Sequence, residues 1–188
     1  MGRIAVHEFT TLDGVIGAPT WTFDHPFDPL MGEAIGRLTA PATAILLGRR
    51  TYEQFAPAWS ARTVDDDPGA PFFNETAKYV VSSTLTSADW NASTVLGRYD
   101  PRTIRELKEK VDGGIYVSGS GTLVRALLAD GLVDELHLFV YPVAVGAGQQ
   151  LFPLTGRSTT LRLVECQAYD SGVVHLAYAL PATSGDRA

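Results

Sequence analysis

Hydrophobic and polar residues change their spacing along the chain in a way that separates strands from helices. Residues 3–10, RIAVHEFT, alternate and include β-branched side chains, which predicts a strand that ends before the turn pair Asp13-Gly14. Residues 42–48, ATAILLG, form a short continuous apolar run, as expected of a strand buried on both faces. Further strands are predicted over residues 78–83, 114–119 and 132–143.

Helices are predicted where apolar residues recur every three or four positions. Asp28-Pro29 and Asp100-Pro101 each have the order of an N-cap followed by a first-turn proline. The predicted helices cover residues 28–39, 50–55, 100–111 and 120–130. Residues 60–76 have no sustained period and are predicted to form a surface loop.

The order of these elements predicts an α/β fold with a mostly parallel central sheet, because strands that alternate with helices need crossover connections. Residues 161–169 and 172–180 flank Asp170-Ser171-Gly172 and predict an antiparallel C-terminal hairpin at one edge. We expect residues 1–180 to form a single domain and residues 181–188 to form a flexible tail.

The composition is that of a globular protein. Of 188 residues, 45% are hydrophobic and 19% are charged, enough for a full core. The net charge of -6 and the pI near 5.1 argue against a nucleic-acid surface. No apolar run approaches the roughly 20 residues that span a bilayer, and the N-terminus lacks a cleavable signal pattern. We therefore expect a cytoplasmic protein without a nucleic-acid or membrane partner.

Cysteine and histidine residues indicate neither a disulfide nor a metal centre. Cys166 is the single cysteine, which excludes an internal disulfide, and its apolar neighbours predict a small core residue. The four histidines have no metal-ligand spacing, so no metal is expected. His7 and Glu8 alternate on the first predicted strand, and one of them is expected to face the core or a pocket.

Polar residues gather at three predicted strand ends, where the ligands of open α/β sheets bind. The three clusters are Gly48-Arg49-Arg50-Thr51, Ser82-Ser83 and Ser118-Gly119-Ser120-Gly121-Thr122. In the last cluster, glycines would let a ligand approach the backbone, and the following helix would offer its free N–H groups to a pyrophosphate. A tight turn with a serine cap would explain that cluster equally well if it stood alone.

The arginine pair strengthens the case for an anionic ligand. A guanidinium group binds phosphate oxygens in a two-pronged geometry. Arginine is unfavourable at a helix start because of the helix dipole, so Arg49 and Arg50 favour a negatively charged partner over a merely solvated helix end. Three such clusters at successive strand ends predict a phosphate-bearing ligand.

These segments together resemble the dihydrofolate reductase-like superfamily, and within it the reductase domain of riboflavin biosynthesis. The resemblance covers about residues 3–180 and is carried by TLDGVIG (11–17), ILLGRRTYE (45–53), YVVSS (79–83) and IYVSGSGTLVRALLADGLVDELHLFVYPVAVGAG (115–148). It implies a three-layer fold, an NADPH-dependent hydride transfer to a small-molecule substrate, and a homodimer that pairs through its C-terminal strands.

The resemblance also assigns cofactor contacts by position. By match, Arg49 and Thr51, with Arg50 between them, would hold the adenosine 2′-phosphate and the neighbouring phosphate, and the serine pair would serve the adenosine end. The glycine turn would bind the pyrophosphate, and the loop TLDGVIGAP would cover the nicotinamide. The predicted cofactor residues are Gly14, Val15, Ile16, Gly17, Gly48, Arg49, Arg50, Thr51, Ser82, Ser83, Ser118, Gly119, Ser120, Gly121 and Thr122.

The substrate side is less defined. The proton donor would be Asp24 or Asp28, although the pattern favours Asp28 as a helix cap. The aromatic residues Trp21, Phe23 and Phe27 would line a substrate pocket or pack the loop. The substrate would be a pterin-like, pyrimidine-like or other heterocycle, or a carbonyl compound.

Two departures from the family pattern argue against folate as the substrate. No acid stands at the usual offset after Trp21, and Phe139 replaces the threonine that supports a pterin in dihydrofolate reductases. The alternative function is therefore a non-catalytic nucleotide- or small-molecule-binding protein on the same fold.

Overall fold

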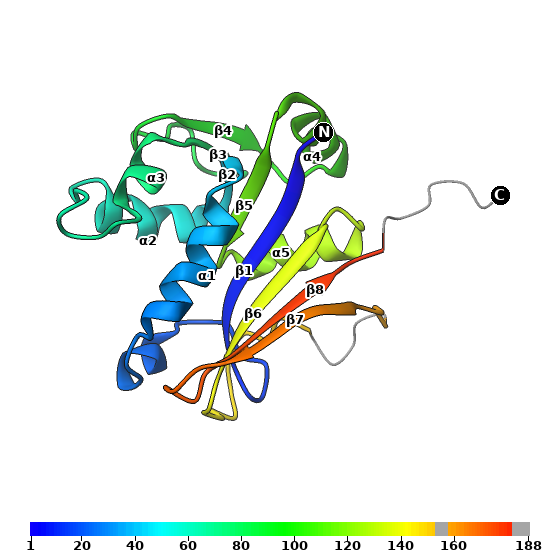
Figure 1. Cartoon of the computed structure of the whole chain (residues 1–188). Coiled ribbons are helices and arrows are strands. Elements are labelled where there is room, and N and C mark those ends of the chain that lie inside the picture. The colour runs from blue at the N-terminus through cyan, green and yellow to red at the C-terminus, as the bar shows by residue number, and fades with distance from the viewer. Residues whose placement is uncertain (153–157, 182–188) are drawn as a thin grey trace.

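A single sheet organises the computed structural model, which describes residues 1–152 and 158–181 (Figure 1). Within these residues, eight strands lie in the order β4-β3-β2-β5-β1-β6-β8-β7. Their bounds are β1 Arg3–Thr11, β2 Ala42–Gly48, β3 Ala77–Val81, β4 Ser93–Gly97, β5 Gly114–Ser118, β6 Glu135–Tyr141, β7 Arg162–Ala168 and β8 Val174–Ala179.

The pairings from β4 through to β6 are parallel, whereas β8 runs antiparallel to both β6 and β7. This confirms the predicted α/β class, with its mostly parallel sheet and its antiparallel C-terminal hairpin. The division into one domain over residues 1–180 stays a prediction. The predicted tail lies outside the described residues, apart from Pro181.

Helices cover both faces of the sheet and produce three layers. Their bounds are α1 Pro29–Thr39, α2 Arg49–Trp59, α3 Ala70–Glu75, α4 Pro101–Lys110 and α5 Gly121–Ala129. Figure 1 shows α1 on the viewer's side of the sheet and α5 behind it. None of the helices in the described ranges is long and apolar enough to cross a bilayer.

Successive residues of a buried strand point to opposite faces of the sheet and pack against different helix layers. Ile45 and Leu47 of β2 pack with α1, α2 and α3, whereas Leu46 packs with α4 and α5. This two-sided burial is why the strand has a continuous apolar run rather than an alternating one. As predicted, Asp28 caps α1 by accepting a hydrogen bond from the Leu30 N–H at 2.9 Å.

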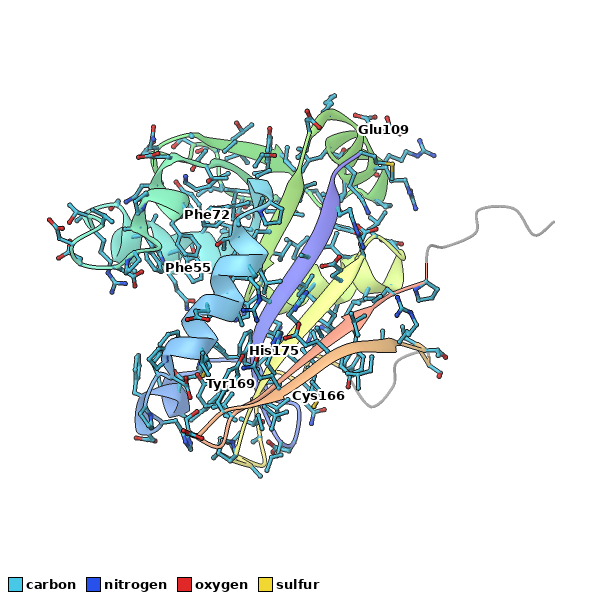
Figure 2. The ribbon with its side chains drawn as sticks, viewed as in Figure 1. Phe55, Phe72, Glu109, Cys166, Tyr169 and His175 are labelled. Atoms are coloured by element: carbon cyan, nitrogen blue, oxygen red, sulfur yellow. The ribbon has the colours of Figure 1, made fainter. Side chains whose placement is uncertain are left out.

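Three predictions about helices and strands are wrong. Helix α2 continues through Pro57 to Trp59, residues 70–75 form α3, and the strand β4 was not predicted. Aromatic packing explains the first two, because the Trp59 ring stacks on Phe73 of α3 with centroids 4.2 Å apart. Figure 2 shows Phe55 and Phe72 on the side of the molecule where α2 and α3 lie. The last turn of α2 is therefore held by tertiary contacts despite its proline.

The prediction that Cys166 of β7 is a core residue is wrong. This residue is exposed, as Figure 2 shows, because β7 is the edge strand and pairs only with β8. Leu163 and Val164 of the same strand are 50% and 59% exposed. Strand β6 is paired on both sides, so a homodimer formed through a sheet edge on this side would use β7. The homodimer stays a prediction.

A buried ion pair joins three segments at the amino end of β1. Lys108 of α4 is 5% exposed, and its Nζ donates to Asp134 Oδ2 at 2.6 Å and to the Leu132 carbonyl at 3.0 Å. The same Asp134 oxygen accepts a hydrogen bond from the Ile4 N–H at 2.7 Å. Removing the carboxylate would leave a buried ammonium group and a backbone N–H without this partner.

We predict that Asp134→Ala lowers the free energy of unfolding by about 2–4 kcal/mol, discounted because the carboxylate is partly exposed. Glu165→Gln is the matched control, since it removes the carboxylate of the exposed Arg37–Glu165 pair, whose atoms are 3.7 Å apart. The control should cost less than about 1 kcal/mol. Urea unfolding measures both, and equal losses would contradict the assigned role of the buried pair.

Glu8 is a second buried ionisable group, and it has no hydrogen-bond partner among the residues that the structure describes. It is 2% exposed, and its Oε1 is enclosed without a hydrogen bond. Burial raises the pKa of its carboxyl well above 4.5, so the folded protein holds it in the neutral form above the pH at which the unfolded chain ionises.

We predict that wild-type stability falls as the pH rises from about 4.5 towards the raised pKa, because only the unfolded chain releases the Glu8 proton in that window. Relative to Glu8→Gln, which cannot ionise, the loss should be about 1.4 kcal/mol per pH unit. Urea unfolding of both proteins at pH 5 and pH 7 measures it. A stability difference that does not change with pH would show that Glu8 is ionised in the fold.

Candidate functional site

The ends of β2 and β5 meet at Ser120. The Gly48 N–H donates to Ser120 Oγ, and the Ser120 N–H donates to Thr51 Oγ1, both at 2.9 Å. Gly119 and Ser120 have φ values of 57° and 60°, in the left-handed region. Two of the predicted clusters are thus brought together, but their hydroxyl groups bind each other's backbone. The Ser120 hydroxyl donates its own proton to the Ser118 carbonyl, at the long distance of 3.5 Å.

Helix α5 begins at Gly121, one residue later than predicted, and the Ser120 side chain does not cap it. The Gln149 carboxamide lies at this helix start instead. We assign the carboxamide the orientation that satisfies both of its ends, in which the oxygen accepts from the Thr122 N–H at 3.3 Å and from Arg125 Nη2 at 3.2 Å. An oxygen therefore occupies the position at which a helix N-terminus binds an anion.

Arg125 was not predicted, and it places a second guanidinium group beside the turn. Its Nη1 donates to the Gln150 carbonyl at 2.8 Å. The signal for Arg125 was its position four residues after Gly121, which puts it one turn into the helix. Gln149 gave no local signal, because it reaches the turn from a loop 28 positions further along the chain than Gly121.

The predicted lid, residues 14–17, closes directly over this turn. The Ile16 N–H donates to the Gln149 carbonyl at 2.8 Å, and the Leu151 N–H donates to the Gly14 carbonyl at 3.1 Å. A Cβ placed on Gly121 would collide with the Ile16 side chain. Gly121 is therefore needed for the lid to approach the turn this closely.

Asp13 fastens the base of the lid to the loop that follows β6. Its carboxylate accepts from the Thr11 hydroxyl and from the N–H groups of Val145 and Gly146, the last at 2.7 Å. The Thr11 and Gly146 hydrogen bonds hold the pKa of Asp13 below its usual range. The lid is consequently anchored by a carboxylate that stays ionised at neutral pH.

The two arginines have different surroundings. Arg49 Nη1 contacts both carboxylate oxygens of Glu53, at 2.8 and 2.9 Å, one helical turn away. Arg50 is exposed and has no recorded ion pair among the described residues. A phosphate group would therefore compete with Glu53 for Arg49 but not for Arg50.

Ser82 and Ser83, which follow β3, also differ in their surroundings. Ser82 is buried, and its Oγ accepts from the N–H groups of Thr84 and Leu85 at 3.1 and 2.9 Å. Ser83 is exposed. Ser82 therefore shapes the turn, and Ser83 is the member that a ligand can reach.

On the substrate side, the structure separates the three predicted aromatic residues. Trp21 lines a cavity of about 350 Å³ between the lid and the loop at residues 145–149. Phe23 and Phe27 are 85% and 59% exposed and do not line it. Among the three, Trp21 is the one that the fold places beside the lid.

The two predicted proton donors lie outside this cavity. Asp24 ends the 3-10 helix η1, Thr20–Asp24, and is exposed. Asp28 caps α1. Their catalytic role stays a prediction. Among the described residues, no cluster of three metal-ligating side chains occurs.

His7 and Glu8 are both buried, whereas only one of them was expected to face inwards. His7 Nδ1 is hydrogen-bonded to the Tyr116 hydroxyl at 2.7 Å. Burial, together with nearby His137 and His175, lowers the pKa of His7 to about 3, so this imidazole is neutral. His7 is thus a structural residue of the layer formed by α1, and Glu8 points to the opposite layer.

Known proteins share this fold over nearly the whole chain. The uncharacterized protein YyaP of Bacillus subtilis (strain 168) is 28% identical, over 94% of each chain. A crystal structure from Shewanella sp. PV-4, linked by name to riboflavin biosynthesis, has a TM-score of 0.78 at 19% identity and covers 96% of this chain and 99% of its own.

A dihydrofolate reductase from Enterococcus faecalis, complexed with NADP(H), has a TM-score of 0.62 at 16% identity and covers 95% of this chain and 96% of its own. These likenesses confirm the dihydrofolate reductase-like fold. The sequence model of the RibD C-terminal domain matches residues 3–175. The chain therefore belongs to the RibD C-terminal domain family, which is reductase-like.

Proposed function

We propose that this protein is an NADPH-dependent reductase that transfers a hydride to a small heterocyclic or carbonyl substrate. The observation that carries the proposal is the left-handed turn at Gly119 and Ser120, which leads into the N-terminus of α5 without a capping hydrogen bond from the Ser120 side chain. A helix start of this kind binds phosphate groups through its N–H groups and its dipole.

The residues present fit NADPH in three respects. Gly121 lets the lid close over the turn, Arg125 adds positive charge beside the turn, and Arg49 and Arg50 stand at the next strand end. The NADP(H) complex of the structurally similar dihydrofolate reductase supports this assignment. NADPH would supply the hydride, while the protein binds and orients it.

The protein's own residues would divide the remaining work. The turn and Arg125 would hold the pyrophosphate after Gln149 moves away, and Arg49 or Arg50 would hold the 2′-phosphate. The lid would exclude water from the nicotinamide, anchored through Asp13. Trp21 would border the substrate in the neighbouring cavity.

The alternative is a non-catalytic binding protein, and one observation favours it. Phe139 is fully buried, and its ring stacks on His175 with centroids 4.4 Å apart, so the position of a pterin-supporting threonine is filled by an aromatic core. Both functions predict nucleotide binding. NADPH oxidation in a screen of pterins, pyrimidines and carbonyl compounds would favour the reductase, and binding without oxidation would favour the alternative.

We predict that NADPH binds at least about tenfold more tightly than NADH, and that Arg49→Ala or Arg50→Ala removes about 1.4 kcal/mol or more of that preference. The reason is that only NADPH carries the 2′-phosphate. Quenching of tryptophan fluorescence measures both affinities. If neither nucleotide binds at millimolar concentration, the reductase proposal fails.

Glu53→Gln separates the roles of the two arginines. It weakens the hold of Glu53 on Arg49 without removing the guanidinium group. If Arg49 binds the 2′-phosphate, NADPH should bind this variant about two- to fivefold more tightly, since an exposed pair of this kind is worth about 0.3–1 kcal/mol. NADH binding should change little. Unchanged NADPH affinity would assign the phosphate to Arg50.

We predict that Thr51→Val weakens NADPH and NADH equally, in contrast to the arginine variants. The change removes the oxygen that accepts the Ser120 N–H, so the turn that binds the shared pyrophosphate loses its support. Stability should fall by about 1–3 kcal/mol. Thr51→Ser, which keeps the hydroxyl, is the control. A selective loss of NADPH binding would place Thr51 at the 2′-phosphate instead.

A further inference from the structure

Glu8 stands beside the glycine turn on the central strand. In the register of β1 and β5, His7 pairs with Ser118, and the Gly119 N–H donates to the His7 carbonyl at 3.3 Å. Glu8 is the next residue of β1, so it lies next to the turn at the carboxyl edge of the sheet. Strand β6 flanks it on the other side, where Glu8 pairs with Leu138.

The carboxyl faces the layer that contains α5 and the lid. Successive residues of a strand point to opposite faces, so Glu8 shares its face with Ile4 and Val6. These two residues belong to the same apolar cluster as Ile16 of the lid and Val124 of α5. The lid residue expected over the nicotinamide therefore covers the same side of the sheet as Glu8.

This carboxyl is unusual because it is buried and unpaired. Its Oε1 is fully enclosed with no hydrogen-bond partner, and the recorded hydrogen bonds of the described residues include none to Glu8. Native proteins rarely leave such a group unsatisfied, because the cost is about 1–3 kcal/mol. The group would be satisfied by a polar ligand that enters beneath the lid.

The chemistry of the carboxyl indicates what kind of ligand group it fits. A neutral carboxylic acid offers one O–H donor and one carbonyl acceptor side by side. A primary carboxamide offers the complementary acceptor and donor, so the two groups can form a pair of hydrogen bonds. Nicotinamide carries a primary carboxamide, and only a ribose separates it from the pyrophosphate that the turn would bind.

The position of Glu8 gives less support to a direct role for its carboxyl as proton donor to the substrate. Trp21, Phe9 and Tyr141 form the aromatic cluster next to the candidate substrate cavity, and they belong to the layer of α1 on the opposite face. Glu8 therefore faces the cofactor side of the sheet.

We infer that the Glu8 carboxyl is a nicotinamide-recognition group, which hydrogen-bonds the carboxamide and fixes the orientation of the ring under the lid. This inference rests on the proposed NADPH-dependent function. It adds a residue that would recognise the nicotinamide, the reactive end of the cofactor, whereas the turn and the arginines would bind its phosphates.

The test compares two ligands on three proteins. The ligands are NADPH and 2′-phospho-ADP-ribose, which has the same phosphates but lacks nicotinamide. The proteins are wild type, Glu8→Gln and Glu8→Leu. Glutamine keeps a donor and an acceptor in the same place, whereas leucine keeps the size and removes both. Affinities are measured by calorimetry, and far-UV circular dichroism checks the fold.

We expect Glu8→Leu to weaken NADPH binding at least about tenfold and to leave 2′-phospho-ADP-ribose within about threefold, because one pair of buried hydrogen bonds is lost. Glu8→Gln should bind both ligands within about threefold of wild type. Equal weakening of both ligands by leucine would mean that Glu8 only supports the fold, and this would overturn the inference.

The remaining outcomes are also decisive. If Glu8→Leu binds NADPH as well as wild type does, the inference fails while the proposed function stands, including when the variant has lost turnover. If Glu8→Leu does not fold, Glu8→Ala takes its place with the same two opposing outcomes, because alanine also removes the donor and the acceptor. If wild type binds neither ligand, the proposed function itself fails, and the inference fails with it.

Discussion

The left-handed backbone at Ser120 is the constraint on which the candidate site depends. A residue with a side chain is disfavoured in this conformation by roughly 1–2 kcal/mol. Two hydrogen bonds to the neighbouring strand end, from Gly48 and to Thr51, offset that cost. They also fix β2 and α2 against β5 and α5. Because the turn is held in this way, α5 starts without a serine cap, and its first N–H groups remain available to an oxygen from elsewhere.

Most of the fold could be predicted because it depends on local patterns. The continuous apolar run of β2 and the Asp-Pro starts of α1 and α4 have physical causes that lie within a few residues. The errors arose where distant contacts decide. Helix α2 passes Pro57 because Trp59 stacks on Phe73, and β4 exists because its backbone pairs with β3. Neither partner is close enough in sequence to leave a periodic signal.

In the candidate site, too, local patterns could be predicted from the sequence and distant contacts could not. Glycines and hydroxyl groups after strands have a local meaning, so the turn at residues 118–122 could be predicted. The hold of Glu53 on Arg49 was also visible, since the two are four residues apart on a helix. By contrast, Gln149 reaches α5 through the folded loop, and the isolation of Glu8 is a property of its completed surroundings. Sequence patterns identify groups that can bind a ligand, but not the internal groups that compete for them.

That competition governs how the site would work. Three of the candidate phosphate-binding groups already have an internal oxygen partner: Gln149 at the start of α5, Glu53 at Arg49, and Thr51 at Ser120. Ligand binding would therefore be an exchange of partners, and its net free energy would be a difference between similar interactions. A phosphate can win this exchange because it carries more charge than a carboxamide or a carboxylate. Arg50 and Ser83 are exposed, and Glu8 has no hydrogen-bond partner among the described residues, so contacts to these groups would add to affinity without that offset.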